Sequence, residues 1–380
     1  MHDAIVIGVG TMGSAACSEL ARRGWNVLGL DQYDIPNALA SHHGRSRMFR
    51  TSYYEHADYV PLLRRALSGW QGLEERTGRR IFHPTGGLYI GPRDGALVGG
   101  SLDAARRHGL PHESLNRAEL ERRFPQLRLP AGFAGMLEAQ AGFIVPELAV
   151  EAMAGEAAAA GATLKARERV IAWDARDATV EVRTVRGTYA AKRLIITAGP
   201  WSGTLAGDAA RVTITRQVVG WVTPRLPELF RLGRWPCWAI EQPGGGLFYG
   251  FPMRDGETGM KVALHAVGEV VEPDELNRDV VPEDEAGWRE GLRRHLPDAD
   301  GPTSAHAVCM YDNSPDGHFI VDLFPRHANI VVACGFSGHG FKFAPVLGEA
   351  IADLAMHGKS SLPIGFLGLA RFETRGGRHE

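Results

Sequence analysis

The start of the chain combines two short apolar runs with a helical pattern between them. Residues 4–7 (AIVI) form a continuous apolar run, which is typical of a strand buried on both faces of a parallel sheet. Residues 12–23 predict a helix, and Gly24 suits the left-handed position that often follows a helix. Residues 26–30 (NVLGL) predict a second strand that ends at Asp31. The pattern therefore predicts a βαβ unit.

Helical and strand-like patterns alternate along the rest of the chain. Helices are predicted over residues 58–76, 148–160 and 345–357, and one more begins at Asn116, with Glu119 as its capping partner. Strands are predicted near residues 85–90, 167–173, 178–184, 188–197 and 330–335.

This order predicts an α/β fold, α+β overall, in which one domain is inserted into another. The cofactor-type pieces stand at the start, in the middle and at the end, so residues 1–80, 146–210 and 305–380 are assigned to one discontinuous domain. The stretches 81–145 and 211–304 carry mixed strand-like runs and are expected to form an inserted substrate-binding domain with a mixed sheet.

The turn between the first strand and the first helix has the pattern G-x-G-x-x-G. Gly8 permits the tight turn, Gly10 lets the backbone approach a pyrophosphate, and Gly13 lets the helix pack on the strand. Asp31, at the end of the second strand, is placed to accept hydrogen bonds from ribose hydroxyls. The pattern predicts a dinucleotide site but does not distinguish FAD from NAD, so an NAD-dependent dehydrogenase stays an alternative when the motif is considered alone.

Charge, hydropathy and cysteine usage exclude several classes of partner. A net charge of −2 over 380 residues provides no long-range field for nucleic acid or an anionic membrane. No apolar run approaches the roughly 20 residues of a membrane helix, and no signal peptide is expected before the first strand. The four cysteines lack CxxC spacing, so a reduced, cytoplasmic protein is expected.

Three further segments carry a family resemblance. They are SHHGRSRMFR at 41–50, AVCMYDNSPDGHFIVD at 307–322 and CGFSGHGFKFAPVLGE at 334–349. Together with the glycine fingerprint, they resemble the monomeric sarcosine oxidase family, which includes N-methyltryptophan oxidase and pipecolate oxidase. The resemblance runs to about residue 371, and it implies a monomer with a glutathione-reductase-like FAD-binding Rossmann domain.

The resemblance also implies how FAD is held. TAGPW at 197–201 resembles the family's second FAD-contacting segment, and Val170 matches a position against the adenine. Cys309 aligns with the cysteine that is joined by a thioether to the flavin 8-methyl carbon, whereas the other three cysteines match no such position. The implied cofactor-binding residues are Gly8, Gly10, Thr11, Met12, Gly13, Asp31, Ser41, His42, Arg47, Val170, Cys309, Gly338, Gly340 and Lys342.

The segment 41–50 matches the family pattern S-H-H-G-x-x-R-x-x-R. The resemblance places His43 and Arg47 beside the flavin and Arg50 on the substrate carboxylate, which suits the planar fork of a guanidinium. Lys342 aligns with the second carboxylate-binding cation. Arg45-Ser46 replaces the commoner Asp-Thr pair of the family, so the charge near the flavin edge is expected to differ.

Lys261 lies in GMKVALH, an alternation that places Met260 and Val262 on the face opposite to it. Most such lysines lie on the wet face of a strand. The family's matching lysine instead sits over the flavin and helps oxygen accept electrons by stabilising superoxide as it forms. His265 shares the face of Lys261 and matches a substrate-pocket histidine, and Tyr311 matches a substrate-side tyrosine.

The resemblance implies an FAD-dependent oxidase of the C–N bond of a secondary or N-methyl amino acid. The products would be an imine, which hydrolyses, and hydrogen peroxide. The alternatives are a flavin dehydrogenase that passes electrons to another carrier, an oxidase of cyclic imino acids such as pipecolate, and a non-catalytic FAD-binding subunit. His306, His318 and His339 lack paired carboxylates or thiolates nearby in sequence, so no metal site is predicted.

Overall fold

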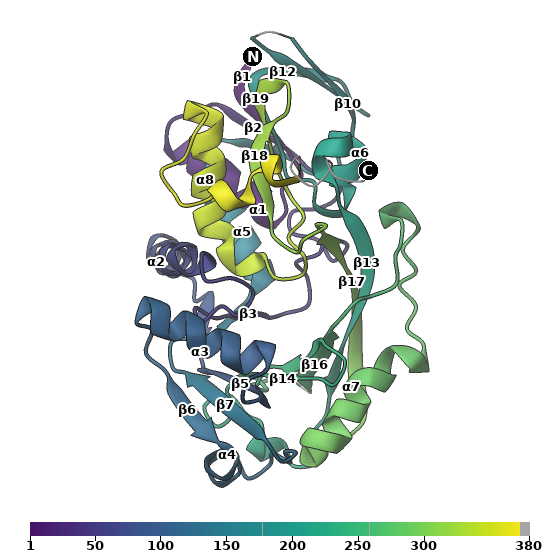
Figure 1. Ribbon diagram of the computed structural model, residues 1–380. Coiled ribbons are helices and arrows are strands. Elements are labelled where there is room, and N and C mark those ends of the chain that lie inside the picture. The colour runs from purple at the N-terminus through teal and green to yellow at the C-terminus, as the bar shows by residue number, and fades with distance from the viewer. Residues whose placement is uncertain (177, 258, 373–380) are drawn as a thin grey trace, which may run out of the picture.

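Two eight-stranded sheets, one in each lobe, organise the chain (Figure 1). The computed structural model describes residues 1–176, 178–257 and 259–372. The strands β13 (Thr213–Val222) and β17 (Thr303–Asn313) pair with each other and run from the level of the first lobe down into the second (Figure 1). Residues 305–313, predicted to belong to the cofactor domain, therefore lie in a strand of the second sheet; the division of the chain into domains stays a prediction.

The first sheet has a parallel centre with antiparallel strands at its margins. The parallel pairs join β9 to β2, β2 to β1, β1 to β12, and β12 to β19. Its strands are β1 (His2–Ile7), β2 (Val27–Leu30), β9 (Thr163–Lys165), β10 (Val170–Ala175), β11 (Val180–Thr184), β12 (Thr188–Ile196), β18 (Ile320–Phe324) and β19 (His327–Cys334).

Both faces of this sheet are covered, which explains its continuous apolar strands. Ala4 and Val6 face a layer of helices, whereas Ile5 and Ile7 belong to the apolar cluster on the opposite side, which includes Ala206, Ala209 and Leu369 from outside the sheet. The helices are α1 (Thr11–Arg22), α2 (Tyr59–Thr77), α5 (Pro146–Ala159) and α8 (Ala344–His357), and Figure 1 shows them gathered on one side of the first lobe.

The second sheet has the order β17-β13-β16-β15-β14-β5-β7-β6, and among these pairs only β14–β5 is parallel. Its remaining strands are β5 (Gly87–Pro92), β6 (Glu113–Asn116), β7 (Phe133–Glu138), β14 (Cys237–Glu241), β15 (Leu247–Gly250) and β16 (Met260–His265). The helices α3 (Ala96–His108), α4 (Arg117–Arg123) and α7 (Pro282–His295) pack on it, and α6 (Ser202–Ala206) lies in the first lobe. A third sheet of β3 (Arg47–Phe49), β8 (Gly142–Ile144) and β4 (Phe82–Pro84) lies between the lobes.

The local predictions for the first lobe are confirmed to within a few residues, including the βαβ unit and the three helices at 58–76, 148–160 and 345–357. Gly24 has the predicted left-handed conformation, with φ of +86°. Asn116 caps α4 by accepting from the backbone N–H of Glu119, whose side chain accepts from the backbone N–H of Asn116.

The stretches 81–145 and 211–304 supply most strands of a mixed sheet, as expected, and they also contain the helices α3 and α7, which were not predicted from the sequence. In α3 two adjacent glycines lower the helix propensity, and one of them, Gly100, lies directly against Tyr54. In α7 the buried residues Trp288 and Leu292 stand one turn apart, and the Trp288 ring covers Gly220 of the sheet. Packing on the sheet, rather than propensity, therefore stabilises both helices.

Candidate active site

A cavity of about 500 Å³ opens at the carboxyl ends of the parallel strands β1, β2 and β12. This edge of an α/β sheet is where nucleotide ligands bind. Most of the predicted cofactor residues line the cavity: Gly8, Gly10, Thr11, Met12, Asp31, Ser41, His42, Arg47, Val170, Gly338 and Gly340. Cys309 and Lys342 instead line a second cavity, and Gly13 packs beneath the turn.

The glycine turn has the geometry that its motif predicts. Gly8 has a φ of +84°, and a β-carbon on Gly13 would overlap the carbonyl oxygen of Gly8. Asp31 accepts from the backbone N–H groups of Val9 and Tyr33, both at 2.8 Å. Burial raises the pKa of Asp31 to about 6, although these two donors act in the opposite direction. The turn, the start of α1 and this acid thus form one end of the large cavity.

The second cavity has a volume of about 100 Å³ and adjoins the first. Arg47, Tyr311, Gly338 and Phe341 line both cavities, so the two meet at these residues. The smaller cavity is also lined by the predicted site residues Arg50, His265, Cys309 and Lys342. Residues from four distant parts of the chain therefore converge where the two lobes meet.

Arg50 lies in the smaller cavity beside an acid that the motif did not reveal. Its Nη2 donates to Oε1 of Glu55, and its guanidinium carbon lies 4.3 Å from the ring centroid of Tyr53. The Nη1 of Arg50 and the Oε2 of Glu55 are buried and have no hydrogen-bond partner among the described residues. Burial alone would raise the pKa of Glu55, but the charge of Arg50 holds it below its ordinary value.

Lys342 is the second cation of this cavity and is 5% exposed. Its Nζ donates to the carbonyl oxygen of His339 at 2.6 Å and lies 5.2 Å from the ring centroid of Tyr53. Burial, followed by repulsion from Arg50, lowers the pKa of Lys342 to about 7. Since a carboxylate would raise that pKa again, the site favours an anion between Arg50 and Lys342.

Lys261 is buried, at 4% exposure, rather than on a wet face. Its Nζ donates to the carbonyl oxygens of Gly44 at 2.7 Å and Ser46 at 2.9 Å. The predicted alternation is confirmed, since Met260 and Val262 on the other face join the apolar cluster of the second lobe. Burial lowers the pKa of Lys261 well below its ordinary value, with repulsion from Arg47 acting in the same direction.

The loop that receives Lys261 is held by charged side chains. Arg47 Nη2 donates to the carbonyl oxygens of Ser41 at 2.7 Å and His43 at 2.6 Å. Glu147, at the start of α5, accepts from the backbone N–H groups of Gly44 at 2.7 Å and Arg45 at 3.0 Å. The loop 41–47 is thus folded back on itself, with the carbonyls of Gly44 and Ser46 directed at Lys261.

Arg45, which replaces the family's commoner aspartate, is exposed and has a φ of +67°. Its guanidinium carbon lies 4.7 Å from the ring centroid of Trp221, and the same centroid is 5.8 Å from Nζ of Lys261. The substitution therefore places an additional positive charge in the neighbourhood of Lys261.

The two neighbouring histidines of the motif differ in position. His42 lines the large cavity, where its Nε2 is buried with no partner among the described residues. His43 is absent from the walls of both cavities, and its Nδ1 lies 2.8 Å from the carbonyl oxygen of Ala40. His265 lies in the smaller cavity with its Nδ1 at 3.3 Å from the hydroxyl of Tyr311. The catalytic roles of His43, His265 and Tyr311 stay predictions.

Residues 3–354 match the FAD dependent oxidoreductase family, abbreviated DAO. The chain belongs to this family. It is 40% identical over 368 residues to monomeric sarcosine oxidase of Streptomyces avermitilis, covering 96% of each chain. It is 35% identical over 373 residues to N-methyl-L-tryptophan oxidase of Salmonella dublin, covering 98% of this chain and 99% of that one. Among solved structures it is similar to NikD, an unusual amino acid oxidase essential for nikkomycin biosynthesis, with a TM-score of 0.84, 26% identity and 97% of both chains covered.

The residues of the large cavity of this FAD-dependent oxidoreductase fit the cofactor of its family. Ser41 Oγ and His42 Nε2 are buried polar atoms on the cavity wall with no partner in the described part of the chain. The volume of about 500 Å³ falls within the range of roughly 300–1,000 Å³ that is usual for ligand pockets. Family membership excludes the alternative of an NAD-dependent dehydrogenase. No helix in the described ranges is long and apolar enough to span a membrane.

Sequence reasoning missed two acids that hold the site together, Glu55 and Glu138. Glu138 is 1% exposed and accepts from the backbone N–H groups of Thr51 at 2.8 Å and Ser52 at 3.1 Å. It also accepts from the hydroxyls of Thr51 and Tyr89. An acid that ends a strand carries no local signal of such a role. Glu138 nevertheless fixes the backbone that directly follows Arg50.

Replacing Glu138 by glutamine is expected to reduce the free energy of unfolding by about 1–3 kcal/mol. The amide NH₂ would face donors, so at least one buried donor that now binds the carboxylate would lose its acceptor. Chemical denaturation of the holoenzyme measures the loss, and Glu283→Gln on the exposed start of α7 is the matched control. Equal stability of the two variants would show that Glu138 does not stabilise this backbone.

Proposed function

We propose that this FAD-dependent oxidoreductase oxidises the C–N bond of a small secondary or N-methyl amino acid such as sarcosine, with oxygen as acceptor. The products are an imine, which hydrolyses, and hydrogen peroxide. The observation that carries the proposal is the small cavity in which Arg50 and Lys342 lie together, adjoining the large cofactor cavity. Full-length relatives that are monomeric sarcosine oxidases support it. A monomeric state and a cytoplasmic location stay predictions from the sequence.

Arg50 and Lys342 would bind the carboxylate of the substrate, and we call this pair of residues the carboxylate clamp. Two cations stand against the single charge of Glu55, so a bound carboxylate completes the charge balance. Arg50 also keeps a buried Nη1 with no partner among the described residues, which is available to a second anion. A planar guanidinium can hold a carboxylate by two hydrogen bonds and so fix its direction.

The other end of the small cavity suits a neutral amine. Burial lowers the pKa of His265 and raises the pKa of Tyr311 well above its ordinary value, so both groups are uncharged near neutral pH. The positive charges of the clamp further disfavour an ammonium form of the substrate. Bound FAD supplies the redox chemistry, accepting two electrons and a hydrogen from the carbon next to nitrogen and passing the electrons to oxygen. The chain orients the amine and keeps it uncharged.

The size of the cavity favours a small substrate. An apolar cavity of about 150 Å³ is known to bind benzene, which has as many non-hydrogen atoms as sarcosine. The cavity here, at about 100 Å³, is no larger, and Leu97, Val219 and Leu247 contribute apolar walls. A substrate the size of N-methyltryptophan or pipecolate would require these walls to move. We therefore expect sarcosine to exceed both in kcat/KM.

We also propose that FAD is attached covalently through Cys309. Of the four cysteines, Cys309 is the one that lines a cavity, at the junction where Tyr311 borders both. Cys17, Cys237 and Cys334 are buried in the core clusters, which agrees with their interpretation as packing residues.

Peroxide release under air tests the proposed function. Sarcosine is expected to turn over, while its methyl ester and amide should have kcat/KM values at least about tenfold lower. Each buried charge left unpaired costs about 1–3 kcal/mol, and about 1.4 kcal/mol corresponds to tenfold. Arg50→Lys should raise KM even though the charge is kept, because two-point binding is lost.

Two outcomes would contradict the proposal. If the ester is as good a substrate as the acid, the carboxylate clamp is wrong. If sarcosine reduces an artificial dye but yields no peroxide in air, the protein is a dehydrogenase that uses another electron carrier.

A further inference from the structure

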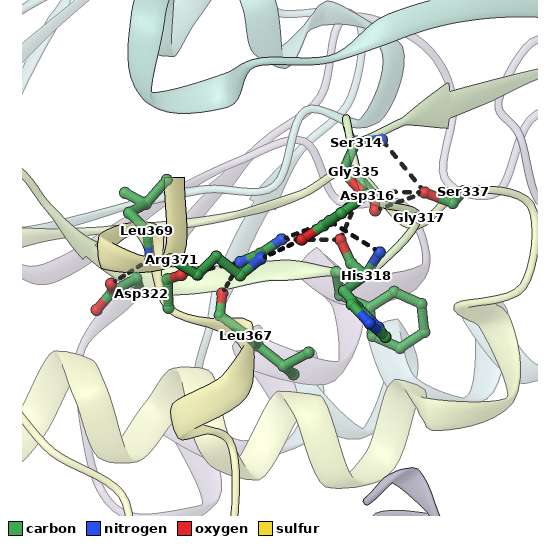
Figure 2. A network of polar contacts seen from close by, with 12 residues as sticks. Ser314, Asp316, Gly317, His318, Asp322, Gly335, Ser337, Leu367, Leu369 and Arg371 are labelled. Carbon is green, nitrogen blue, oxygen red and sulfur yellow. Dashed lines mark hydrogen bonds and ion pairs between the residues drawn. The ribbon is translucent and has the colours of Figure 1, made fainter. Parts of the chain in front are cut away.

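The loop between β17 and β18, residues Ser314–His318, is tied to the C-terminal part of the chain by Arg371 (Figure 2). Arg371 Nε and Nη2 donate to the two carboxylate oxygens of Asp316 at 2.9 and 3.3 Å. Nη2 also donates to the carbonyl oxygen of His318 at 3.0 Å. Nη1 donates to the carbonyl oxygens of Leu367 at 2.7 Å and Gly368 at 2.9 Å. One guanidinium thus joins the 314–318 loop to the last helical turns.

Bonds within the 314–318 loop give it one conformation. Asp316 accepts from the backbone N–H of His318 at 3.1 Å, and the hydroxyl of Ser314 donates to the carbonyl of His318 at 2.6 Å. Ser314 N–H donates to the hydroxyl of Ser337 at 3.2 Å, on the segment that leads to Lys342 (Figure 2). Gly317, between Asp316 and His318, has a φ of +77°, which glycine adopts readily. These bonds on both sides of Gly317 therefore fix the direction in which its carbonyl points.

That carbonyl determines the tautomer of His339. The Nε2 of His339 lies 3.0 Å from the Gly317 oxygen, and its Nδ1 lies 2.5 Å from the Tyr53 hydroxyl. A carbonyl oxygen only accepts, so Nε2 carries the hydrogen. Burial lowers the pKa of His339 to about 3, so the ring is neutral and Nδ1 is left as an acceptor. The hydroxyl of Tyr53 must then donate to Nδ1.

Both cations of the carboxylate clamp contact this arrangement. Tyr53 lies 4.3 Å from the guanidinium carbon of Arg50 and 5.2 Å from Nζ of Lys342, measured to its ring centroid. Lys342 Nζ in addition donates to the backbone carbonyl of His339 at 2.6 Å. A rotation of the His339 ring would release Tyr53, and a shift of its backbone would release Lys342.

We propose that His339 is a positioning residue for the carboxylate clamp, and that the Arg371–Asp316 pair acts through the Gly317 carbonyl to hold His339 in place. The inference rests on the clamp of the proposed function. Loosening this chain of contacts changes how well the two cations are aligned with a carboxylate. The bonds that it weakens are those of the His339 ring to Tyr53 and Gly317, which lie away from the glycine turn at residues 8–13, so we expect substrate affinity to fall more than the maximal rate.

Two isosteric variants separate the bonds of His339. His339→Gln keeps a donor at the position of Nε2, whereas His339→Asn keeps an acceptor at the position of Nδ1. The probe is methoxyacetate, which has an ether oxygen in place of the amine of sarcosine, and its Kd is read from the perturbed flavin spectrum. Both variants are expected to raise this Kd and the KM for sarcosine by about fivefold or more, with kcat within about twofold of the original.

Tyr53→Phe, which keeps the ring but removes the hydroxyl, tests the path through Tyr53. Combined with His339→Gln it should weaken binding no more than His339→Gln alone, because the two changes remove the same bond. Independent, additive losses would contradict a shared path. Should the His339 variants fail to fold, Tyr53→Phe and Arg371→Ala decide the matter, and an unchanged Kd of methoxyacetate in both would contradict the inference.

Arg371→Ala tests the part of the inference farthest from the clamp, which is the role of the Arg371–Asp316 pair in holding the Gly317 carbonyl. It is expected to raise the Kd of methoxyacetate about threefold or more, and Arg371→Lys should restore part of the loss because the ion pair with Asp316 can persist. Arg211→Ala is the matched control, since Arg211 also lies over the ring of Phe372 but forms no hydrogen bond or ion pair with the 314–318 loop among the described residues.

The outcomes distinguish this inference from the proposed function. If methoxyacetate does not bind the original protein, or the ester matches the acid, the clamp itself is wrong. If it binds and the His339 variants leave its Kd unchanged, His339 does not position the clamp. If Arg371→Ala behaves like Arg211→Ala, the part assigned to Arg371 is wrong.

Discussion

Replacing Cys309 by serine is expected to convert covalently bound FAD into FAD that is released completely on acid precipitation. The thioether needs the sulfur of this side chain, and no other cysteine lines either cavity among the described residues. The pellet of the original protein should stay yellow, whereas that of Cys309→Ser should be colourless with the flavin in the supernatant. Absorbance of the two fractions measures the effect.

Cys17→Ala is the matched control, because Cys17 is also a buried cysteine but lies on α1 in the apolar core, away from both cavities. Its pellet should keep the flavin. Free FAD from the original protein would refute covalent attachment, and a yellow pellet from Cys309→Ser would show that another residue forms the bond. Neither result would affect the assignment of the chain to the FAD-dependent oxidoreductase family.

Replacing Lys261 by methionine is expected to slow reoxidation by oxygen by about a hundredfold or more, with a much smaller effect on anaerobic reduction by substrate. Unit charges about 4 Å apart interact by roughly 4 kcal/mol at an effective dielectric of about 20, and about 1.4 kcal/mol is tenfold in rate. Burial lowers the pKa of Lys261, but negative charge that develops on oxygen raises this pKa again and so favours the ammonium form as the charge forms.

Stopped-flow measurement of the two half-reactions separates this role from a general loss of structure. Methionine fills much of the space of lysine but leaves the carbonyls of Gly44 and Ser46 without their donor, so some loss in stability is expected as well. Lys359→Met, on the exposed turn after α8, serves as the control. An unchanged rate of reoxidation in Lys261→Met would remove Lys261 from this role.

Local patterns in the sequence were sufficient for the βαβ unit and the long helices of the first lobe, but not for its short elements β9, β18 and α6. The apolar run 4–7, the glycine turn and Gly24 each depend on neighbouring residues, and the structure has the strand, turn and helix where these signals predict them. The capping pair at Asn116 is likewise a local device. The helices α3 and α7 were not predicted because their stability comes from packing on the second sheet, which a local pattern does not contain.

The predicted site depended on the family motifs rather than on general pattern reading. Those motifs named Arg50, Lys261 and Lys342, which lie far apart in the chain and which the structure brings to the boundary between the lobes. Periodicity alone would have left Lys261 on a wet face, whereas the fold buries it against the carbonyls of the loop 41–47. Burial depends on which loop covers a strand, and this is decided only when the lobes pack.

The sequence by itself determined the cofactor class, the βαβ unit and the identity of the cations Arg50, Lys261 and Lys342. Each of these depends on a short motif of neighbouring residues. Only the tertiary structure decided that Glu55 faces Arg50, that Glu138 holds the backbone beside it, and that His339 has a single tautomer. It also decided the size of the small cavity. These properties depend on contacts between residues that are far apart in the sequence. The packing of the two sheets and the loop 41–47 sets the distances between those residues, and a local sequence pattern does not contain them.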